Sequence, residues 1–503
     1  MSRVVLTTLN ARYSHTSIAL RYLYANLHEI KLDATIVEFA IKEENELIAQ
    51  SLLELKPEII GIGVYIWNAS KIEQLLTILK DKAPEVIIIL GGPEVSYTPY
   101  RINIDKADYI IQGEGEDALY NLCKRLLNKE KRQELIYKST PLDVKNILLP
   151  YDYYNDEDIA NRHIYVEASR GCPFLCEFCL SSIDKRVRYF DEDKFLESLE
   201  RLWSRGARNF RFIDRTFNLN IEYANRLLDF FLLKESPYFV HFEVIPEVFP
   251  ESLRSRLIQF PPTSLQLEIG IQTLDKTVAK NISRPLNFRK IVENITFLQT
   301  DTKAHLHLDL IVGLPGESLE QFGRNLDTLV SFSSAEIQIG ILKKLSGTRI
   351  NRHDEEYSMA YSHIPPYDII SNNLLNVETI DEMKVFARYW DLCYNSGNFT
   401  HTVKLIWDEK SVFDNFRAFS KWVYEYSGKS TAFYLDTLAE YIFVYLTNIK
   451  NMQDLEVANV IADDIMKIKG RILPKFLRGF DLNYKQQDAL KLDASLKRQQ
   501  KHM

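Results

Sequence analysis

The sequence predicts an α/β protein in three parts: a doubly wound, Rossmann-like N-terminal domain, a partial TIM-like (β/α)6 barrel and a helical C-terminal domain. Two observations indicate this. Short apolar runs alternate with amphipathic stretches, first near the N-terminus and again in the middle of the chain, which is typical of parallel strands covered by helices. Beyond about residue 355, the sequence contains no further short apolar runs that are typical of strands. The expected boundaries are 1–130, a linker at 131–160, 161–354 and 355–503.

The N-terminal domain is expected to contain four buried strands. Leu20, Leu23, Leu27 and Ile30 recur at helical spacing after the first of them, which predicts an amphipathic helix. Uniformly apolar strands alternating with helices favour a parallel sheet covered on both faces. The strand candidates are "RVVLTTLN", "PEIIGIGVYI", "PEVIIILGGPEV" and "ADYIIQGEGE".

Six βα repeats are expected in the middle region. Their number is smaller than the eight of a closed TIM barrel, so an open, partial barrel is predicted. The helices include 191–206 and 221–235, and the C-terminal domain should contain helices near 379–397 and 430–449. The strand candidates are "IYVEAS", "NFRFID", "VHFEVI", "LQLEIGIQ", "HLHLDLIVGL" and "EIQIGIL".

Composition excludes several classes of protein. The 503 residues are 46% hydrophobic and 26% charged, and 62 basic against 69 acidic residues give a net charge of -7, which leaves no clear nucleic-acid footprint. The N-terminus shows no signal-peptide segment, and the apolar runs are too short to span a membrane. Five cysteines in so long a chain do not indicate a disulfide framework. We expect a cytoplasmic protein.

Cys172, Cys176 and Cys179 form C-x3-C-x2-C directly after a predicted strand. Thiolates are the usual ligands of iron–sulfur clusters, and three of them leave one iron of a 4Fe–4S cluster without a protein ligand. A structural zinc site would need a fourth ligand. Cys123 and Cys393 fit better as core residues on helix faces, although zinc binding and a chance clustering of buried thiols remain the alternatives.

This motif after the first strand of a partial barrel, with Phe178 before the third cysteine, resembles the radical S-adenosylmethionine (SAM) enzymes. The resemblance implies that Cys172, Cys176 and Cys179 hold a 4Fe–4S cluster whose open iron is chelated by SAM. One-electron reduction then cleaves SAM to methionine and a 5'-deoxyadenosyl radical.

The same resemblance assigns SAM-binding roles along the barrel. It implies that Asp214 contacts the SAM amine, although an Asp at a strand–helix turn is also an ordinary cap. Arg284 would hold the SAM carboxylate, although a lone Arg is also a common surface ion-pair partner. The remaining expected contacts are Glu268 and Gln272, with Thr273 beside them, for ribose, and Gly313 and Pro315 of "GLPGE" for adenine; Glu317 is expected to cap the following helix.

The N-terminal domain resembles the cobalamin-binding domains fused to many radical SAM enzymes. "LGGPEVS" and "DYIIQGEGE" carry this resemblance, and glycines at strand ends let a ligand approach the backbone, although ordinary βα turns also use them. The expected cobalamin contacts are Gly63, where a serine is usual, and Gly91, Gly92, Gly113 and Gly115. His15 lies in "YSHTSI" without the Asp and Gly of the cobalt-ligating motif, which argues against cobalt ligation by His15.

The whole chain resembles the anaerobic magnesium-protoporphyrin IX monomethyl ester cyclase-related group, with an extra C-terminal helical domain of unknown function. The resemblance implies a cobalamin-dependent radical SAM enzyme performing methylation or rearrangement, served by a low-potential electron donor such as flavodoxin or ferredoxin. Two alternatives stay open: a radical SAM enzyme whose front domain only docks substrate, and a non-catalytic iron–sulfur redox sensor. No catalytic acid or base and no substrate are assigned.

Overall fold

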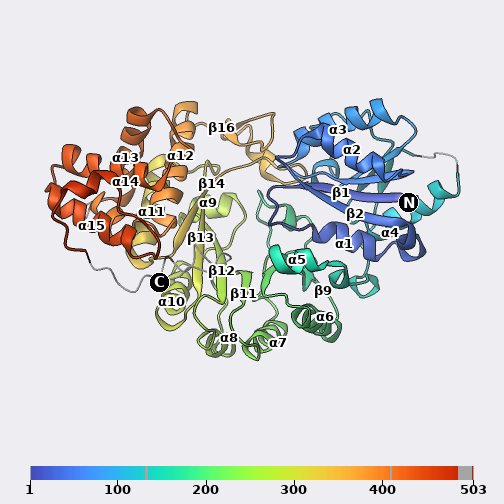
Figure 1. Ribbon diagram of the computed structural model, residues 1–503, viewed down its shortest axis with the longest axis horizontal. Helices are drawn as coiled ribbons and strands as arrows, with labels where there is room; N and C mark the ends of the chain where they lie inside the picture. Colours follow the sequence, from blue (N-terminus) through green and yellow to red (C-terminus); the bar gives the residue numbers. More distant parts are fainter. Residues whose placement is uncertain (1, 131–133, 408–409, 485–500, 502–503) are drawn as a thin grey trace. The chain divides into compact units, whose positions relative to one another are not determined.

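The computed structural model describes residues 2–130, 134–407, 410–484 and 501 (Figure 1). The chain divides into two compact units. Unit 1 comprises residues 1–243, 343–352 and 361–368, and unit 2 comprises 244–342, 353–360 and 369–503. Each unit is described separately below.

The front of unit 1 is a parallel six-stranded sheet in the order β2-β1-β3-β4-β5-β6. This order, with the sheet growing outward from β1 in both directions, is that of a doubly wound fold. Its strands are β1 (Val4–Asn10), β2 (Ala34–Ala40), β3 (Ile59–Gly63), β4 (Ile87–Gly91), β5 (Tyr109–Gln112) and β6 (Ile136–Lys138).

Helices cover both faces of this sheet (Figure 1). Alternate residues of β1 point to opposite sides: Val5 and Leu9 pack with α2 (Asn45–Glu54) and α3 (Ala69–Lys82), whereas Val4 and Leu6 pack with α1 (Ile18–Ala25) and α4 (Glu116–Leu127). Burial on both faces explains why these strands are apolar throughout.

The six barrel strands predicted from the sequence are confirmed, and all of their described pairings are parallel. In unit 1, β10 (Asn209–Phe212) pairs with β7 (Ile164–Val166) and β11 (Phe239–Val244). In unit 2, β13 (His305–Val312) pairs with β12 (Leu265–Gln272) and β14 (Glu336–Ile341). The helices of this region are α5 (Asp156–Asn161), α6 (Glu192–Ser204), α7 (Ile221–Leu232), α8 (Glu251–Leu257), α9 (Lys276–Asn281), α10 (Phe288–Asp301) and α11 (Leu319–Phe332).

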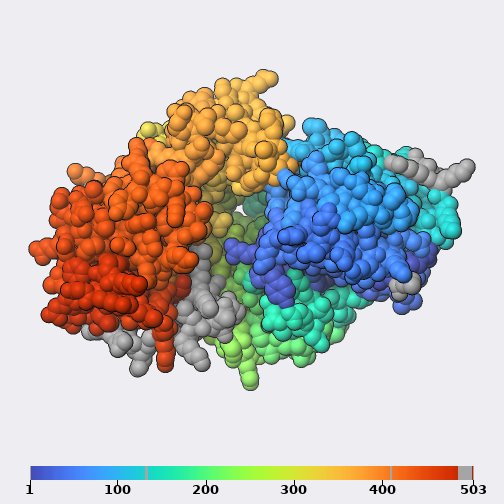
Figure 2. All heavy atoms as spheres, turned by 45° about the horizontal axis from the view of Figure 1, so that its top comes forward, coloured from blue at the N-terminus to red at the C-terminus, as the bar shows by residue number. Residues whose placement is uncertain are grey.

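The C-terminal part of unit 2 is mainly helical, as predicted, and forms a continuous packed surface in the space-filling view (Figure 2, orange to red). Trp390 is fully buried, stacked on Tyr394 with ring centroids 4.4 Å apart and edge-on to Phe416, so it is a core residue. The helices are α12 (Val377–Trp390), continued by a π-helical turn (Asp391–Asn395), α13 (Val412–Ser427), α14 (Leu435–Val444) and α15 (Asp454–Met466).

Several short strands were missed. β2 lies at a sheet edge and its residues are only partly buried, and β6 has three residues inside the segment taken as a linker. The expectation that strands stop beyond residue 355 is wrong for β15 (Ala360–Tyr361) and β16 (Ile369–Ser371), which are too short to leave a periodic signal. None of the helices in the described residues is long and apolar enough to cross a membrane.

Candidate functional site

The cysteine motif lies on a loop that is closed at its base. β8 (Ser169–Arg170) and β9 (Arg188–Tyr189) form an antiparallel ladder around it, and the Cys172 amide donates to the Asp184 carbonyl over 3.0 Å. Gly171 has φ +90°, and a Cβ there would lie 2.2 Å from the Arg186 carbonyl oxygen, so only glycine fits.

The five cysteines fall into two kinds. Cys172 and Cys176 are buried within the loop and Cys179 is partly exposed, whereas Cys123 and Cys393 have no exposed surface and pack among apolar core side chains. Burial raises the pKa of the Cys123 thiol to about 12, which disfavours the thiolate a metal requires. Three loop cysteines separated from two core cysteines fit a cluster with three protein ligands, and Cys123 and Cys393 are confirmed as core residues.

Asp214 anchors the segment that enters the cysteine loop. Its carboxylate accepts hydrogen bonds from Ser169 Oγ at 2.6 Å and from the Ala168 amide at 3.0 Å. Burial raises the pKa of Asp214 to about 7, against the lowering effect of these donors. The structure therefore shows Asp214 supporting the loop; its contact with the SAM amine stays a prediction.

A cavity of about 320 Å³ opens at the carboxyl ends of β1, β3, β4 and β5 in unit 1. This is the edge at which open α/β sheets bind ligands, and the volume is of the order that ligand pockets have. The walls are mainly apolar, with Ile18, Leu23 and Tyr65 among them. All five predicted cobalamin contacts line it: Gly63, Gly91, Gly92, Gly113 and Gly115.

His15 does not belong to the residues that line this cavity. Its Nδ1 lies 2.6 Å from the Tyr165 hydroxyl, and its ring stacks on that of Tyr165. Burial, assisted by nearby arginines, lowers the pKa of His15. The hydrogen bond to Tyr165 involves Nδ1 and not Nε2, so the expectation that His15 does not ligate cobalt stays a prediction.

A buried ion-pair network joins the cavity to the cysteine loop. Arg170, directly before Gly171, lies 2.7 Å from Glu116, 3.1 Å from Glu167 and 3.6 Å from Glu114. Arg188, its partner across the loop base, also pairs with Glu114. Burial opposes the charge of Arg170, but Glu167 and Glu116 outweigh it and raise the Arg170 pKa. Arg170 and the three glutamates also line the cavity.

Sequence reasoning missed this network. Glu114 and Glu116 belong to "QGEGE", in which only the glycines were singled out, and Arg170 precedes the cysteines in "SRGC". The available signals were the two carboxylates that flank a glycine turn and the cation beside a metal-binding motif. Nothing in the sequence links them, because they are more than fifty positions apart.

The other SAM candidates lie in unit 2, most of them near the carboxyl ends of β12 and β13. Gln272 ends β12 with φ 67°, and the Arg284 guanidinium donates to the Gly270 carbonyl beside it. Gly313, with φ +91°, begins the turn after β13, and the Pro315 carbonyl accepts from Asn281 at 2.9 Å. Glu268 lies mid-strand, in register with His307. SAM binding by these residues stays a prediction.

Glu317 is not a helix cap, which corrects the sequence expectation. Ser318 caps α11 in a capping box with Gln321. Glu317 is instead buried, and its Oε1 accepts hydrogen bonds from Thr273 at 2.7 Å and Asn325 at 2.9 Å. Burial raises the pKa of Glu317 to about 8, so its carboxyl is mainly protonated at neutral pH. The network ties the turn after β13 to the end of β12.

Comparison with known proteins agrees with this architecture. Residues 4–123 match the B12 binding domain, 166–329 the radical SAM superfamily, and 355–502 a protein family of unknown function, DUF4080. The chain is thus a radical SAM enzyme fronted by a B12-binding domain. Within that class it carries an additional C-terminal DUF4080 domain, and its relatives include the anaerobic magnesium-protoporphyrin IX monomethyl ester cyclases.

An uncharacterized methyltransferase of Pyrococcus horikoshii is 24% identical over 335 residues, which cover 60% of this chain and 70% of that protein. The cobalamin-dependent radical SAM methyltransferase TokK of Streptomyces tokunonensis is 21% identical, with 57% of this chain and 47% of TokK covered. The cyclase of Cereibacter sphaeroides is 25% identical, with 31% and 30% covered, so the chain spans only part of several relatives.

Among solved structures, the cobalamin-dependent SAM radical enzyme OxsB matches with a TM-score of 0.62 at 13% identity, covering 91% of this chain and 78% of OxsB. The radical SAM methyltransferase TsrM of Kitasatospora setae matches with a TM-score of 0.56 at 14% identity, covering 69% and 75%. These matches show a shared fold. The cofactors that belong with these domains are a 4Fe–4S cluster, SAM and cobalamin.

Replacing all three loop cysteines, in a Cys172→Ala/Cys176→Ala/Cys179→Ala variant, should remove the roughly four cluster irons and the visible absorption of the cluster from the anaerobically reconstituted protein. Cys123→Ala is the matched control and should keep its iron, because that thiol lies in the core of the front domain. Iron analysis and the visible absorption spectrum measure both. A triple variant with a normal cluster spectrum would contradict the ligand assignment.

Arg170→Met should destabilise the protein by about 3–5 kcal/mol, because it leaves buried carboxylates without their cation. Arg3→Met removes an exposed pair with Glu58 and should cost about 0–1 kcal/mol. Thermal or urea unfolding compares the two variants with wild type. Equal, small effects would show that the buried network does not stabilise unit 1.

Glu317→Gln should make stability less dependent on pH. The folded-state pKa of about 8 lies above the unfolded value of 4.5, so the folded state binds the extra proton and stability falls as pH rises from about 4.5 to 8. The loss is at most about 1.4 kcal/mol per pH unit. Unfolding midpoints at pH 6 and pH 8 should therefore differ more in wild type and in the exposed control Glu440→Gln than in Glu317→Gln. An unchanged difference would refute the protonated carboxyl.

Proposed function

We propose that this protein is a cobalamin-dependent radical SAM methyltransferase acting on an unidentified substrate. One observation carries the proposal: Arg170 belongs both to the lining of the glycine-rich cavity and to the base of the cysteine loop. When bound, the cluster and SAM supply an organic radical that activates a C–H bond, and cobalamin supplies the methyl group. The protein's own task is to hold the two cofactor sites together and dry.

The cavity suits a corrin for reasons that its residues supply. Glycines at three strand ends leave room for a large, flat ligand, and the apolar walls bury it from water. A Cβ at Gly92 would lie 2.6 Å from the Val64 carbonyl oxygen, so this turn needs glycine to bring the chain close to the strand end. Because His15 is not among the residues that line the cavity, we infer that cobalamin would bind without His15 as a cobalt ligand.

The cysteine loop suits SAM activation because three thiolates leave one iron for SAM. Asp214 and the ladder of β8 and β9 fix the loop entry, and the ion pairs of Arg170 and Arg188 hold its base. We assign the SAM amine to Asp214, the carboxylate to Arg284, the ribose to Glu268 and Gln272, and the adenine to the Gly313–Pro315 turn. A low-potential donor such as flavodoxin or ferredoxin would deliver the electron.

The proposal is tested on the full chain, reconstituted anaerobically with iron, sulfide and hydroxocobalamin. We expect the desalted protein to retain both cofactors by visible spectroscopy. With reductant and methyl-labelled SAM, label should reach the retained cobalamin, measured by mass spectrometry, and 5'-deoxyadenosine should form. Retained cluster without retained corrin would favour a front domain that only docks substrate. A cluster that never cleaves SAM would favour a redox sensor.

Gly91→Leu should lower corrin retention at least tenfold while iron and SAM binding persist. A Cβ at Gly91 meets only the Ile111 carbonyl oxygen, at 3.9 Å, so the larger side chain fills the cavity without a backbone clash. Gly479→Leu is the control, because nothing lies within 4 Å of a Cβ there and Gly479 is outside the cavity. Equal corrin retention by both variants would place the corrin elsewhere.

A further inference from the structure

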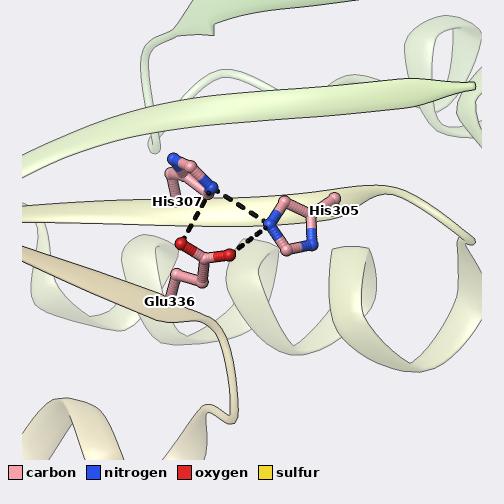
Figure 3. Close-up of side chains that lie close together, drawn as sticks. All are labelled: His305, His307 and Glu336. Carbon is pink, nitrogen blue, oxygen red and sulfur yellow. Dashed lines mark hydrogen bonds and ion pairs between the residues drawn. The ribbon is translucent and has the colours of Figure 1, made fainter. Parts of the chain in front are cut away.

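His305, His307 and Glu336 converge in unit 2 (Figure 3), and Glu268, one of the expected ribose contacts, lies opposite His307 on β12. His305 Nε2 lies 3.0 Å from His307 Nε2 and 2.8 Å from Glu336 Oε1, and His307 Nε2 lies 3.3 Å from Glu336 Oε2. The side chain of Glu336 is 2% exposed and those of the histidines 11% and 16%. Sequence reasoning did not single out any of the three.

The strand pattern produces this convergence. His305 and His307 are two positions apart on β13, so both project from the same face. In the parallel register His307 lies opposite Glu336, the first residue of β14. All three therefore lie at the amino ends of their strands. Gly313 lies at the other end of β13, about 26 Å away along the strand, so this group is separate from the turn assigned to SAM.

Hydrogen bonding within the trio cannot satisfy all three contacts. An imidazole Nε2 has either a proton to donate or a lone pair to accept, never both. If both Nε2 atoms donate to Glu336, the two N–H groups face each other at 3.0 Å. If either Nε2 is unprotonated, its lone pair faces the carboxylate. With Glu336 ionised, every assignment of protons to the two imidazoles leaves one contact repulsive.

If a metal ion lies at the centre, the three short contacts become the distances between neighbouring atoms that bind the same ion. Metal–ligand bonds of about 2.0–2.1 Å in a tetrahedral site place neighbouring ligand atoms about 3.3 Å apart, close to the separations of 2.8 to 3.3 Å found here. Two imidazoles and one carboxylate are a ligand set of catalytic zinc and non-haem iron sites. We propose that His305, His307 and Glu336 bind one divalent first-row transition-metal ion, with Zn²⁺ and Fe²⁺ sharing the required ligand chemistry.

The surroundings fit such a site. Gln266 on β12 is buried, and its side-chain amide lies 3.3 Å from His307 Nδ1. The Gln266 atom nearest to His307 Nδ1 is Nε2. Because His307 Nε2 must be free to bind the ion, the loaded site requires the amide to be turned over, so that its oxygen accepts the proton of Nδ1. Tyr394 of the DUF4080 domain is half-buried and lies near Glu336.

Glu336 also lies next to the point at which the DUF4080 domain contacts β14. The Asn395 side chain accepts from the Ile337 amide at 2.8 Å and donates to the Ile337 carbonyl at 2.9 Å. An ion beside this contact would link β13 to β14 next to the DUF4080 domain, which lies outside the radical SAM match. Three protein ligands also leave a coordination position for water or a small ligand.

The test is metal analysis of the untagged, full-length protein after loading with Zn²⁺ or, anaerobically, with Fe²⁺, followed by desalting. Wild type should retain about one ion per chain beyond the cluster iron. The Cys172→Ala/Cys176→Ala/Cys179→Ala variant should retain the same ion, which measures site iron without cluster iron. Retention of Zn²⁺ or of Fe²⁺ by this variant distinguishes the two metals. Retention of less than a tenth of an ion by wild type under both loadings would overturn the proposal without any histidine variant.

Variants locate the ion. His305→Gln/His307→Gln should reduce retention at least tenfold, whereas His363→Gln, which changes an exposed histidine outside the site, should leave it unchanged. Gln266→Leu should weaken binding about 10–100-fold in a competition titration with a chromophoric chelator, and Gln266→Glu should restore it. Full retention by the double histidine variant would place the ion elsewhere and overturn the assignment.

Discussion

The buried cation of Arg170 constrains the arrangement of unit 1 more than any apolar contact does. A guanidinium that is nine-tenths removed from water requires carboxylates in direct contact, and it finds them in Glu114 and Glu116 from the front domain and Glu167 from the barrel. The turn after β5 and the residue before the cysteines are therefore fixed against each other. Apolar packing tolerates sliding, whereas this network has a single satisfied geometry.

This constraint links two sites that the sequence shows as separate motifs. The glycines at the strand ends create the cavity, and the two glutamates between and after them provide its charged wall. The same glutamates form ion pairs with Arg170 and Arg188 at the base of the cysteine loop. The two sites are therefore connected through the side chains of Arg170, Arg188 and Glu114.

The fold was largely predictable because its strands are chemically distinct. Runs such as that of β4 are buried on both faces, and such runs cannot be mistaken for exposed helices. β2 was not predicted because, as an edge strand, it is half exposed. β6 was not predicted because three residues are too few to show a periodic pattern. The glycines were found because turns at strand ends require them locally, whereas the partners of Arg170 are set only by the folded chain.

The surroundings of the buried carboxyl groups could not be predicted from the sequence. Asp214 and Glu317 follow strands in places where a cap or a ligand contact is the usual role. Both are enclosed, with pKa values raised to about 7 and 8. Sequence gives residue type and position but not the dielectric around a carboxyl group. Each group accepts hydrogen bonds from the chain next to a proposed cofactor contact, so both stabilise the backbone on which those contacts depend.

The inner face of β12 to β14 follows from the same alternation that predicts the strands. "HLHLDLIV" alternates polar and apolar residues, and Leu306, Leu308 and Leu310 are buried while the residues between them are partly exposed. A closed barrel would fill its interior with branched apolar side chains. A polar interior in an open barrel must instead be balanced by ligands, water or ions. At the amino end, where His305, His307 and Glu336 meet, the proposed metal ion would be such an ion.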